Sequence, residues 1–381
     1  MEKRQRVIII GPAYPYRGGL SAFNERLARA FEEAGYEVAI HTFRLQYPKL
    51  LFPGKTQFSE DPPPVGLAIR RTINTVNPLN WLYAAKQIRD FDPVLVVVRF
   101  WLPFLGPSLG SILRLVPGKK TKLIGIVDNI VPHEKRPGDF WFARYFVGSL
   151  DACVVMSGIV GKQLQKFVSS QPIVECAHPV YDNYGPPLAR AEALGQLGLE
   201  SKYRYLLFFG FIRPYKGLDL ALQALALVRD QLPEVRLIVA GEFYTDPAPY
   251  EKIISTLQLE DRVILHTRFI SNEQVAAYFG AADLVVQPYR SATQSGISEL
   301  AYFYEKPVLV TNVGGLPEIV RNGQTGLIVE PEPESLAAGI LKFFQIADPL
   351  ETFGAGIREE KKRHSWAALV ETLLKIRKQI A

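Results

Sequence analysis

Short apolar runs alternate with helical patterns along the whole chain. Continuous apolar strands separated by helices are typical of parallel sheets that are covered by helices on both faces. Six such runs fall in each half of the chain, so the pattern predicts an α/β protein with two doubly wound, Rossmann-like domains. The runs are 7–10, 38–42, 94–98, 123–127, 153–156 and 173–176 in the first half, and 205–209, 236–240, 263–266, 284–287, 308–311 and 327–329 in the second.

A stretch rich in proline and glycine separates the two sets of runs, and linkers have this composition. We therefore predict a first domain over 1–180, a linker over 181–200 and a second domain over 201–363. The last segment, 364–381, has an amphipathic helical pattern and follows all the strands of the second domain. We expect it to return to the first domain.

Composition and charge narrow the class of protein. The 381 residues are 48% hydrophobic and 22% charged, which is globular, and the net charge of +6 favours an anionic ligand or surface. This balance does not indicate nucleic acid, and we predict no nucleic-acid partner. Cys153 and Cys176 lie in separate apolar runs without metal-ligand spacing, which favours a reduced, cytoplasmic protein. The basic opening resembles a first strand more than a signal peptide, and polar residues and prolines interrupt 94–116, so we expect no spanning helix.

The segment 287–320 carries two successive strand ends, and ligands of doubly wound sheets bind beyond the carboxyl ends of strands. The small polar run from Ser291 to Gly296 opens a helix whose free N–H groups suit a phosphate. Glu299, one turn inside, is placed to accept hydrogen bonds from two ribose hydroxyls. The next strand ends in Gly314-Gly315. An ordinary capped βαβ unit is the alternative for this segment alone.

Two cations follow the first strand of the second half, in the sequence Gly210-Phe211-Ile212-Arg213-Pro214-Tyr215-Lys216-Gly217. Arg213 offers a planar fork of donors to phosphate oxygens, and Lys216 adds a compact charge. Such a pair at the mouth of a parallel sheet is costly without an anion. A solvated surface pair is the alternative, but it would not need the flanking glycines.

Other strand ends add weaker candidates. After the first strand of the chain come Gly18 and Gly19, where bare backbone precedes a helix start. In the second half, Gly241-Glu242 ends one strand, and Phe269-Ile270 follows another and is placed to contact a base.

Together these motifs resemble the donor half of retaining glycosyltransferase family 4, which has the GT-B fold. The resemblance covers nearly all of the second domain, on 210–219, 239–242, 271–286, Glu299 and 306–318, and rests in the first domain on Gly18-Gly19 and the strand order. It implies that Arg213 and Lys216 hold the diphosphate of a nucleotide sugar such as a UDP or GDP sugar, that Glu299 holds the ribose, and that Gly19 approaches the phosphates.

The chain departs from the family pattern at two places. Ser291 stands where the family usually has a glutamate that contacts the transferred sugar, which implies weaker or altered sugar recognition through Thr293, Gln294 and Ser295, with Gly296 beside them in the donor site. The family also tends to place a histidine after the fourth strand of the first domain. Here the candidates for that catalytic role are Asp128, Asn129 and His133; a solvated surface histidine is the alternative for the last.

We expect no metal and no cofactor. Asp90-Phe91-Asp92 has the DxD spacing by which a different glycosyltransferase fold holds a divalent metal, but it precedes a strand and therefore lies at the wrong end for a ligand. Cationic side chains and helix dipoles would then neutralise the leaving diphosphate.

The resemblance implies a retaining transfer of a sugar from a nucleotide diphosphate donor to a glycan or lipid-linked acceptor, in surface polysaccharide, glycolipid or glycoconjugate synthesis. Alternatives are an epimerase or a phosphorylase on the same fold, and a degenerate nucleotide-binding or interaction protein. The basic and aromatic stretches 44–55 and 69–81 add the hypothesis of peripheral contact with the inner face of a membrane.

Overall fold

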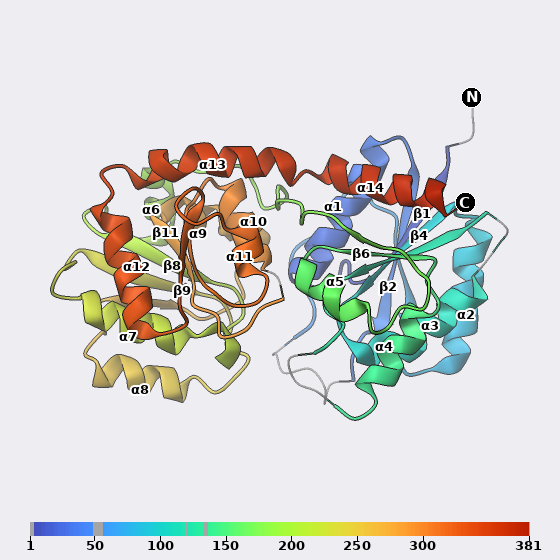
Figure 1. Ribbon diagram of the computed structural model, residues 1–381, viewed down its shortest axis with the longest axis horizontal. Helices are drawn as coiled ribbons and strands as arrows, with labels where there is room; N and C mark the ends of the chain where they lie inside the picture. The colour runs from blue at the N-terminus through green and yellow to red at the C-terminus, as the bar shows by residue number, and fades with distance from the viewer. Residues whose placement is uncertain are drawn as a thin grey trace. The chain divides into compact units, whose positions relative to one another are not determined.

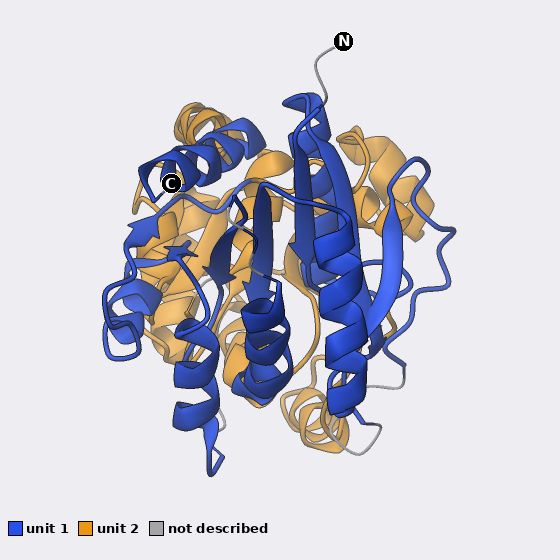
Figure 2. Ribbon diagram, turned by 90° about the vertical axis from the view of Figure 1, so that its right-hand side faces the viewer, with its two compact units in different colours: residues 1–179, 365–381 blue, residues 180–364 orange. Residues whose placement is uncertain are grey.

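The computed structural model describes residues 4–48, 56–116, 118, 120–132, 136–293 and 295–380. The chain divides into two compact units, one formed by 1–179 with 365–381 and the other by 180–364 (Figure 2). The predicted linker, 181–200, falls in the second unit. Its residues Arg190–Leu197 form helix α6, which packs on α9 (Asn272–Ala281).

The first unit is built on a parallel sheet with the strand order β3-β2-β1-β4-β5-β6-β7 (Figure 1). Helices α2 to α5 contribute to one continuous apolar core against this sheet, and α1 packs on β2 and on the C-terminal helix α14. The strands are β1 (Arg6–Ile10), β2 (Glu37–Leu45), β3 (Ile69–Asn74), β4 (Leu95–Phe100), β5 (Lys122–Val127), β6 (Ala152–Val155) and β7 (Ile173–Glu175), and the helices are α1 (Gly19–Glu33), α2 (Pro78–Asp90), α3 (Gly106–Leu115), α4 (Asp139–Val147), α5 (Gly158–Leu164) and α14 (Trp366–Gln379).

Strand β3 was not predicted. Its sequence, Ile69–Asn74, places Arg70 and Arg71 on exposed positions of an edge strand, and it pairs with β2 alone. An edge strand keeps one side open to water, so it lacks the continuous apolar run that identifies the buried strands.

The second unit is built on a parallel sheet with the order β10-β9-β8-β11-β12-β13, and these are the six strands that the pattern predicts. All run in one direction, so their carboxyl ends meet at one edge. The strands are β8 (Arg204–Phe209), β9 (Val235–Ala240), β10 (Val263–His266), β11 (Leu284–Gln287), β12 (Val308–Thr311) and β13 (Gly326–Val329), and the helices besides α6 and α9 are the 3-10 turn η3 (Pro214–Lys216), α7 (Leu218–Val228), α8 (Ala248–Thr256), α10 (Gly296–Phe303), α11 (Leu316–Ile319), α12 (Pro333–Gln345) and α13 (Pro349–Arg363).

The Asp90-Phe91-Asp92 triplet lies before β4, at the amino end of the sheet. Helix α2 ends at Asp90, and Asp92 has a positive φ of 53° while its N–H donates to the Arg89 carbonyl. The triplet therefore ends a helix. No helix in the described ranges is both long and apolar enough to cross a membrane.

Candidate active site

The loop after β8 brings Arg213 and Lys216 to the carboxyl edge of the second sheet. Arg213 precedes the short turn η3, Lys216 ends it, and Gly217 then caps α7 with a left-handed φ of 67°. No side chain of the described residues caps α7, so the N–H groups of Leu218 and Asp219 at its start are open to an anion. Two cations and a helix start therefore share one strand end.

Neither cation has a carboxylate partner among the described residues. The Arg213 guanidinium lies 5.2 Å from the centroid of the Tyr244 ring, and the Lys216 ammonium lies 5.5 Å from that of Tyr289. Burial, with the positive charge of Arg213, lowers the pKa of Lys216 to about 8. A buried cationic side chain that has no carboxylate partner is stabilised when an anion binds beside it.

The strand ends around this pair approach each other closely because glycine occupies them. A β-carbon on Gly241 would lie 2.1 Å from the Gly210 carbonyl oxygen, and one on Gly217 would lie 2.0 Å from that of Pro288. A β-carbon on Gly314 would lie 1.5 Å from the Ala292 carbonyl oxygen. The glycines predicted from the motifs therefore allow the loops after neighbouring strands to pack backbone against backbone.

Replacing Gly217 with alanine is expected to lower the free energy of unfolding by about 3 kcal/mol, because the new β-carbon meets backbone and the residue keeps a positive φ. Gly195→Ala is the matched control, since a β-carbon there, inside α6, meets nothing within 4 Å, and it should leave stability unchanged or raise it. Urea unfolding measures both. Wild-type stability of Gly217→Ala would contradict the close approach.

The loop after β11 is held by a small buried network. Gln287, 1% exposed, accepts a hydrogen bond from Ser295 Oγ at 2.5 Å and donates one to Ser298 Oγ at 2.9 Å. Ser295 also caps α10 by accepting from the Ile297 N–H. Its side chain therefore shapes the helix start, where Gly296 begins α10 and Thr293 is half-buried. Gln294 lies outside the described residues.

Aromatic rings gather at the ends of β8, β9 and β10. Phe211 lies 4.2 Å from Tyr244 and 6.5 Å from Phe269 between ring centroids. Ile270 beside Phe269 is buried, as is Glu242. Flat apolar rings next to two cations suit a ligand with a base and a phosphate.

This site lies within the part of the chain that a family model matches. Residues 189–360 match the model described as glycosyl transferases, group 1. The second unit belongs to the group 1 glycosyl transferases. A curated relative, the D-inositol 3-phosphate glycosyltransferase of Streptomyces scabiei, is 30% identical over 217 residues, which are 54% of this chain and 48% of that protein. The chain thus spans about half the length of this relative.

Solved structures establish the fold of the whole chain. Sucrose-phosphate synthase from Thermosynechococcus elongatus is similar over 99% of both chains, with a TM-score of 0.76 and 20% identity. The Anabaena protein HepE, solved in complex with UDP, is similar over 99% of this chain and 98% of its own, with a TM-score of 0.70 and 18% identity. The two Rossmann-like units therefore form the predicted GT-B fold of glycosyltransferases.

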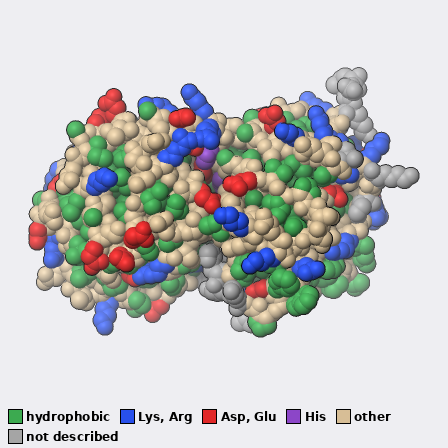
Figure 3. Space-filling model, viewed as in Figure 1, with side chains coloured by type: hydrophobic (Ala, Val, Ile, Leu, Met, Phe, Trp, Pro, Cys, Tyr) green, Lys and Arg blue, Asp and Glu red, His purple; other side chains and the backbone are tan. Residues whose placement is uncertain are grey.

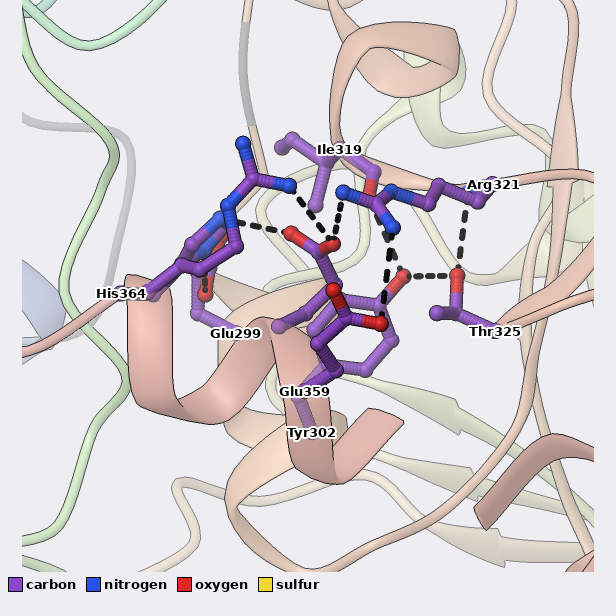
Figure 4. Close-up of polar contacts among 9 residues, drawn as sticks. Glu299, Tyr302, Ile319, Arg321, Thr325, Glu359 and His364 are labelled. Carbon is purple, nitrogen blue, oxygen red and sulfur yellow. Dashed lines mark hydrogen bonds and ion pairs between the residues drawn. The ribbon is translucent and has the colours of Figure 1, made fainter. Parts of the chain in front are cut away.

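Glu299, the predicted ribose ligand of this glycosyltransferase unit, lies in a buried charge cluster. Its carboxylate is fully buried, and its two oxygens lie 3.0 and 2.9 Å from Nδ1 of His364, toward which it points (Figure 4). His364 Nε2 lies 3.2 Å from Glu360, whose other oxygen pairs with Arg321 at 2.5 Å. Burial raises the pKa of Glu299, and His364 partly offsets this. A ribose contact would require this pair to open, and the ribose role stays a prediction.

In the first unit, Gly18 and Gly19 lie at the start of α1, with a φ of 102° at Gly18. Asp128, just after β5, is buried and receives two hydrogen bonds from Arg99, at 2.5 Å from Nε and 2.6 Å from Nη2. The Arg99 guanidinium in turn lies 3.6 Å from the centroid of the Phe23 ring. This geometry favours an anchoring role for Asp128, whose catalytic role stays a prediction. His133 lies outside the described residues.

Two partners of the candidate residues were not identified from the sequence. Arg99 interrupts the apolar strand β4, and an arginine at a buried strand position requires an acidic partner, so this signal was present. His364 had no such signal. It lies 65 positions from Glu299 and reaches it through the return of α13.

Proposed function

We propose that this protein is a retaining, metal-independent glycosyltransferase that moves a sugar from a nucleotide diphosphate sugar to an acceptor hydroxyl. The observation that carries the proposal is the pair Arg213 and Lys216. Among the described residues, these cations stand without an acidic partner at the carboxyl edge of the second sheet, beside the uncapped start of α7. A diphosphate supplies the missing negative charge.

In the proposed reaction the bond between the sugar C1 and the diphosphate oxygen breaks, and C1 forms a bond to the acceptor oxygen on the same face. The acceptor proton passes to the departing phosphate. Arg213 and Lys216 stabilise the charge that develops on the diphosphate, and the start of α7 adds its dipole. The protein then works by orientation and electrostatics, without a covalent intermediate.

UDP is the first nucleotide to test, since HepE was solved in complex with it, and GDP is the second. We place the base against Phe269 and the backbone of Ile270, and the sugar near Thr293 and the start of α10. The acceptor class we propose is a glycan or lipid-linked hydroxyl in surface polysaccharide or glycolipid synthesis, in the cytoplasm.

UDP or GDP is expected to raise the thermal unfolding temperature, whereas the matching nucleoside and monophosphate should do so weakly, because the diphosphate makes the contacts with the cations. A nucleotide present at 100 times its Kd stabilises by about 2.7 kcal/mol. Differential scanning fluorimetry with the series uridine, UMP and UDP, and the guanosine series in parallel, measures this. Equal increases in unfolding temperature for nucleoside, monophosphate and diphosphate would show that the diphosphate does not contact Arg213 and Lys216.

Incubation with a UDP or GDP sugar and an acceptor pool, followed by mass spectrometry, tests transfer itself. An inverted sugar C2 without acceptor would instead identify an epimerase. That outcome is disfavoured by the structure's carboxylates, because Glu299 and Asp128 are already engaged by His364 and Arg99. Nucleotide binding with no transfer would identify a degenerate member.

A further inference from the structure

Helix α4 of the first unit carries apolar side chains on its exposed side as well as on its buried side. Its inward residues Ala143, Phe146 and Val147 are buried in the core of the unit. A surface helix ordinarily turns polar residues to solvent. In α4 the outward positions are instead mostly aromatic: Trp141 is 69% exposed, Phe140 43%, Tyr145 40% and Phe142 39%.

We call these four residues the α4 aromatic face. Their side chains cannot be accommodated in the core, because the buried side of the helix is already packed. The backbone of α4 is packed tightly on α3, because a β-carbon on Gly106 would lie 2.2 Å from the Phe142 carbonyl oxygen. Phe100 stacks on Phe146 at 4.0 Å between ring centroids, so the inner side of the helix is filled. The exposed rings therefore have no place to turn inward.

Cations accompany the aromatic face. Arg144 and Arg136 are exposed, and neither has a side-chain partner among the described residues. Arg114 lies 4.0 Å from the centroid of the Tyr145 ring. The acid of the segment, Asp139, is engaged by the Arg136 N–H at 2.7 Å. The segment thus exposes arginines among aromatic side chains. This arrangement is complementary to a surface with an anionic outer layer and an apolar interior.

A second helix continues this pattern. Helix α2 packs on α3, which packs on α4, and α2 exposes Leu79 by 77%, Leu82 by 56% and Tyr83 by 46%. Figure 3, in the orientation of Figure 1, shows hydrophobic side chains gathered at the lower right, where Figure 1 places α3 and α4. Helix α2 follows β3 and helix α4 follows β5 along the chain.

We propose that the α4 aromatic face binds the surface of an anionic lipid bilayer, with the rings of Trp141 and its neighbours in the headgroup region and Arg144 and Arg136 on the phosphates. Tryptophan and tyrosine favour that interface, and each arginine near an anionic surface adds attraction. Of the stretches suggested by the sequence, residues 49–55 lie outside the described residues. In the stretch 69–81, Arg71 donates to the Phe43 and Arg44 carbonyls, and Leu79 is one of the exposed apolar residues of α2.

The full-length protein should sediment with vesicles of phosphatidylcholine mixed with phosphatidylglycerol, and weakly with phosphatidylcholine alone. Trp141→Ala should lower the partition coefficient about tenfold, and Arg144→Gln about fivefold. Trp141→Phe should keep most of the binding but remove the blue shift of tryptophan emission, because Trp141 is the exposed tryptophan of the described chain. Leu227→Ala and Lys202→Gln, exposed positions of the second unit, are the matched controls.

Thermal unfolding of each variant verifies that it is folded. Absence of sedimentation with either vesicle, or sedimentation that Trp141→Ala and Arg144→Gln leave unchanged, would overturn the proposal. A concentration-dependent dimer that Trp141→Ala dissolves, without vesicle binding, would overturn it in favour of a second copy of the chain as the occupant. None of these readouts depends on transfer activity, so the proposed function can fail while this inference holds.

Discussion

Lys216→Met is expected to lower kcat of sugar transfer about 100-fold to 1,000-fold, the usual cost of removing one donor that stabilises developing charge. Methionine keeps much of the aliphatic stem while removing the ammonium, which lies 5.5 Å from the centroid of the Tyr289 ring. Burial and Arg213 disfavour the charge on Lys216 in the ligand-free protein. The variant should therefore be at least as stable as the wild type at pH 7, which separates loss of catalysis from loss of fold.

Lys202→Met is the matched control, because Lys202 precedes β8 and Lys216 follows it, so they lie toward opposite ends of one strand. Lys202 is exposed and pairs with Glu200, and its replacement should leave transfer unchanged. Steady-state rates at saturating donor measure both variants. Unchanged kcat for Lys216→Met would reject its role and, with it, the charge argument for the site.

The pH dependence of nucleotide binding gives a second readout of the same change. The free Lys216 has a pKa of about 8, so the fraction that carries the charge falls as pH rises through 8. UDP affinity should accordingly decrease above pH 8, and binding near that pH should take up protons because the diphosphate restores the charge. Calorimetry in buffers of different ionisation enthalpy detects this uptake, which Lys216→Met should abolish.

His364→Ala is expected to lower the free energy of unfolding by about 3 kcal/mol, because it leaves two buried carboxylates without their shared partner. Glu299 is fully buried, Glu360 is 4% exposed, and His364 contacts both. Burial alone would lower the pKa of His364, but its contacts with Glu299 and Glu360 outweigh burial and raise the pKa above 6.5. This stabilisation is complete below pH 6.5 and is lost as pH rises through the raised pKa.

The difference between wild type and His364→Ala should therefore shrink from pH 6 to pH 9 in urea unfolding. His266→Ala is the matched control: His266 contacts the Tyr278 hydroxyl at 2.9 Å, and burial, then Arg268, lowers its pKa. His266→Ala should lower the free energy of unfolding by about 1 kcal/mol, the usual contribution of one hydrogen bond, and this difference should not decrease at high pH. Equal costs for the two histidines at pH 6 would show that the charge cluster adds no stability.

The buried strands of the second unit were predictable because each is a continuous apolar run with helical patterns on either side. The same rule failed at β3, where an edge position allows Arg70 and Arg71 to face solvent. At the site, Arg213, Lys216 and Gly217 were predictable because their chemistry is local: the cations and the left-handed glycine lie within five residues of one another, after one strand end. Local sequence specifies such loops.

The sequence by itself determined the two Rossmann-like units and the cationic strand end of the second unit, since apolar periodicity and turn chemistry act over a few neighbouring residues. Only the tertiary structure determined the contacts of the charged residues that have no partner nearby in the sequence. It paired Arg99 with Asp128, and it placed His364, from the end of the second unit, against Glu299. It also showed that α4 keeps its aromatic residues outside. The contacts of buried charges, and the burial of apolar residues, depend on packing between segments that are far apart in the sequence. The spacing of residues along the chain does not specify that packing.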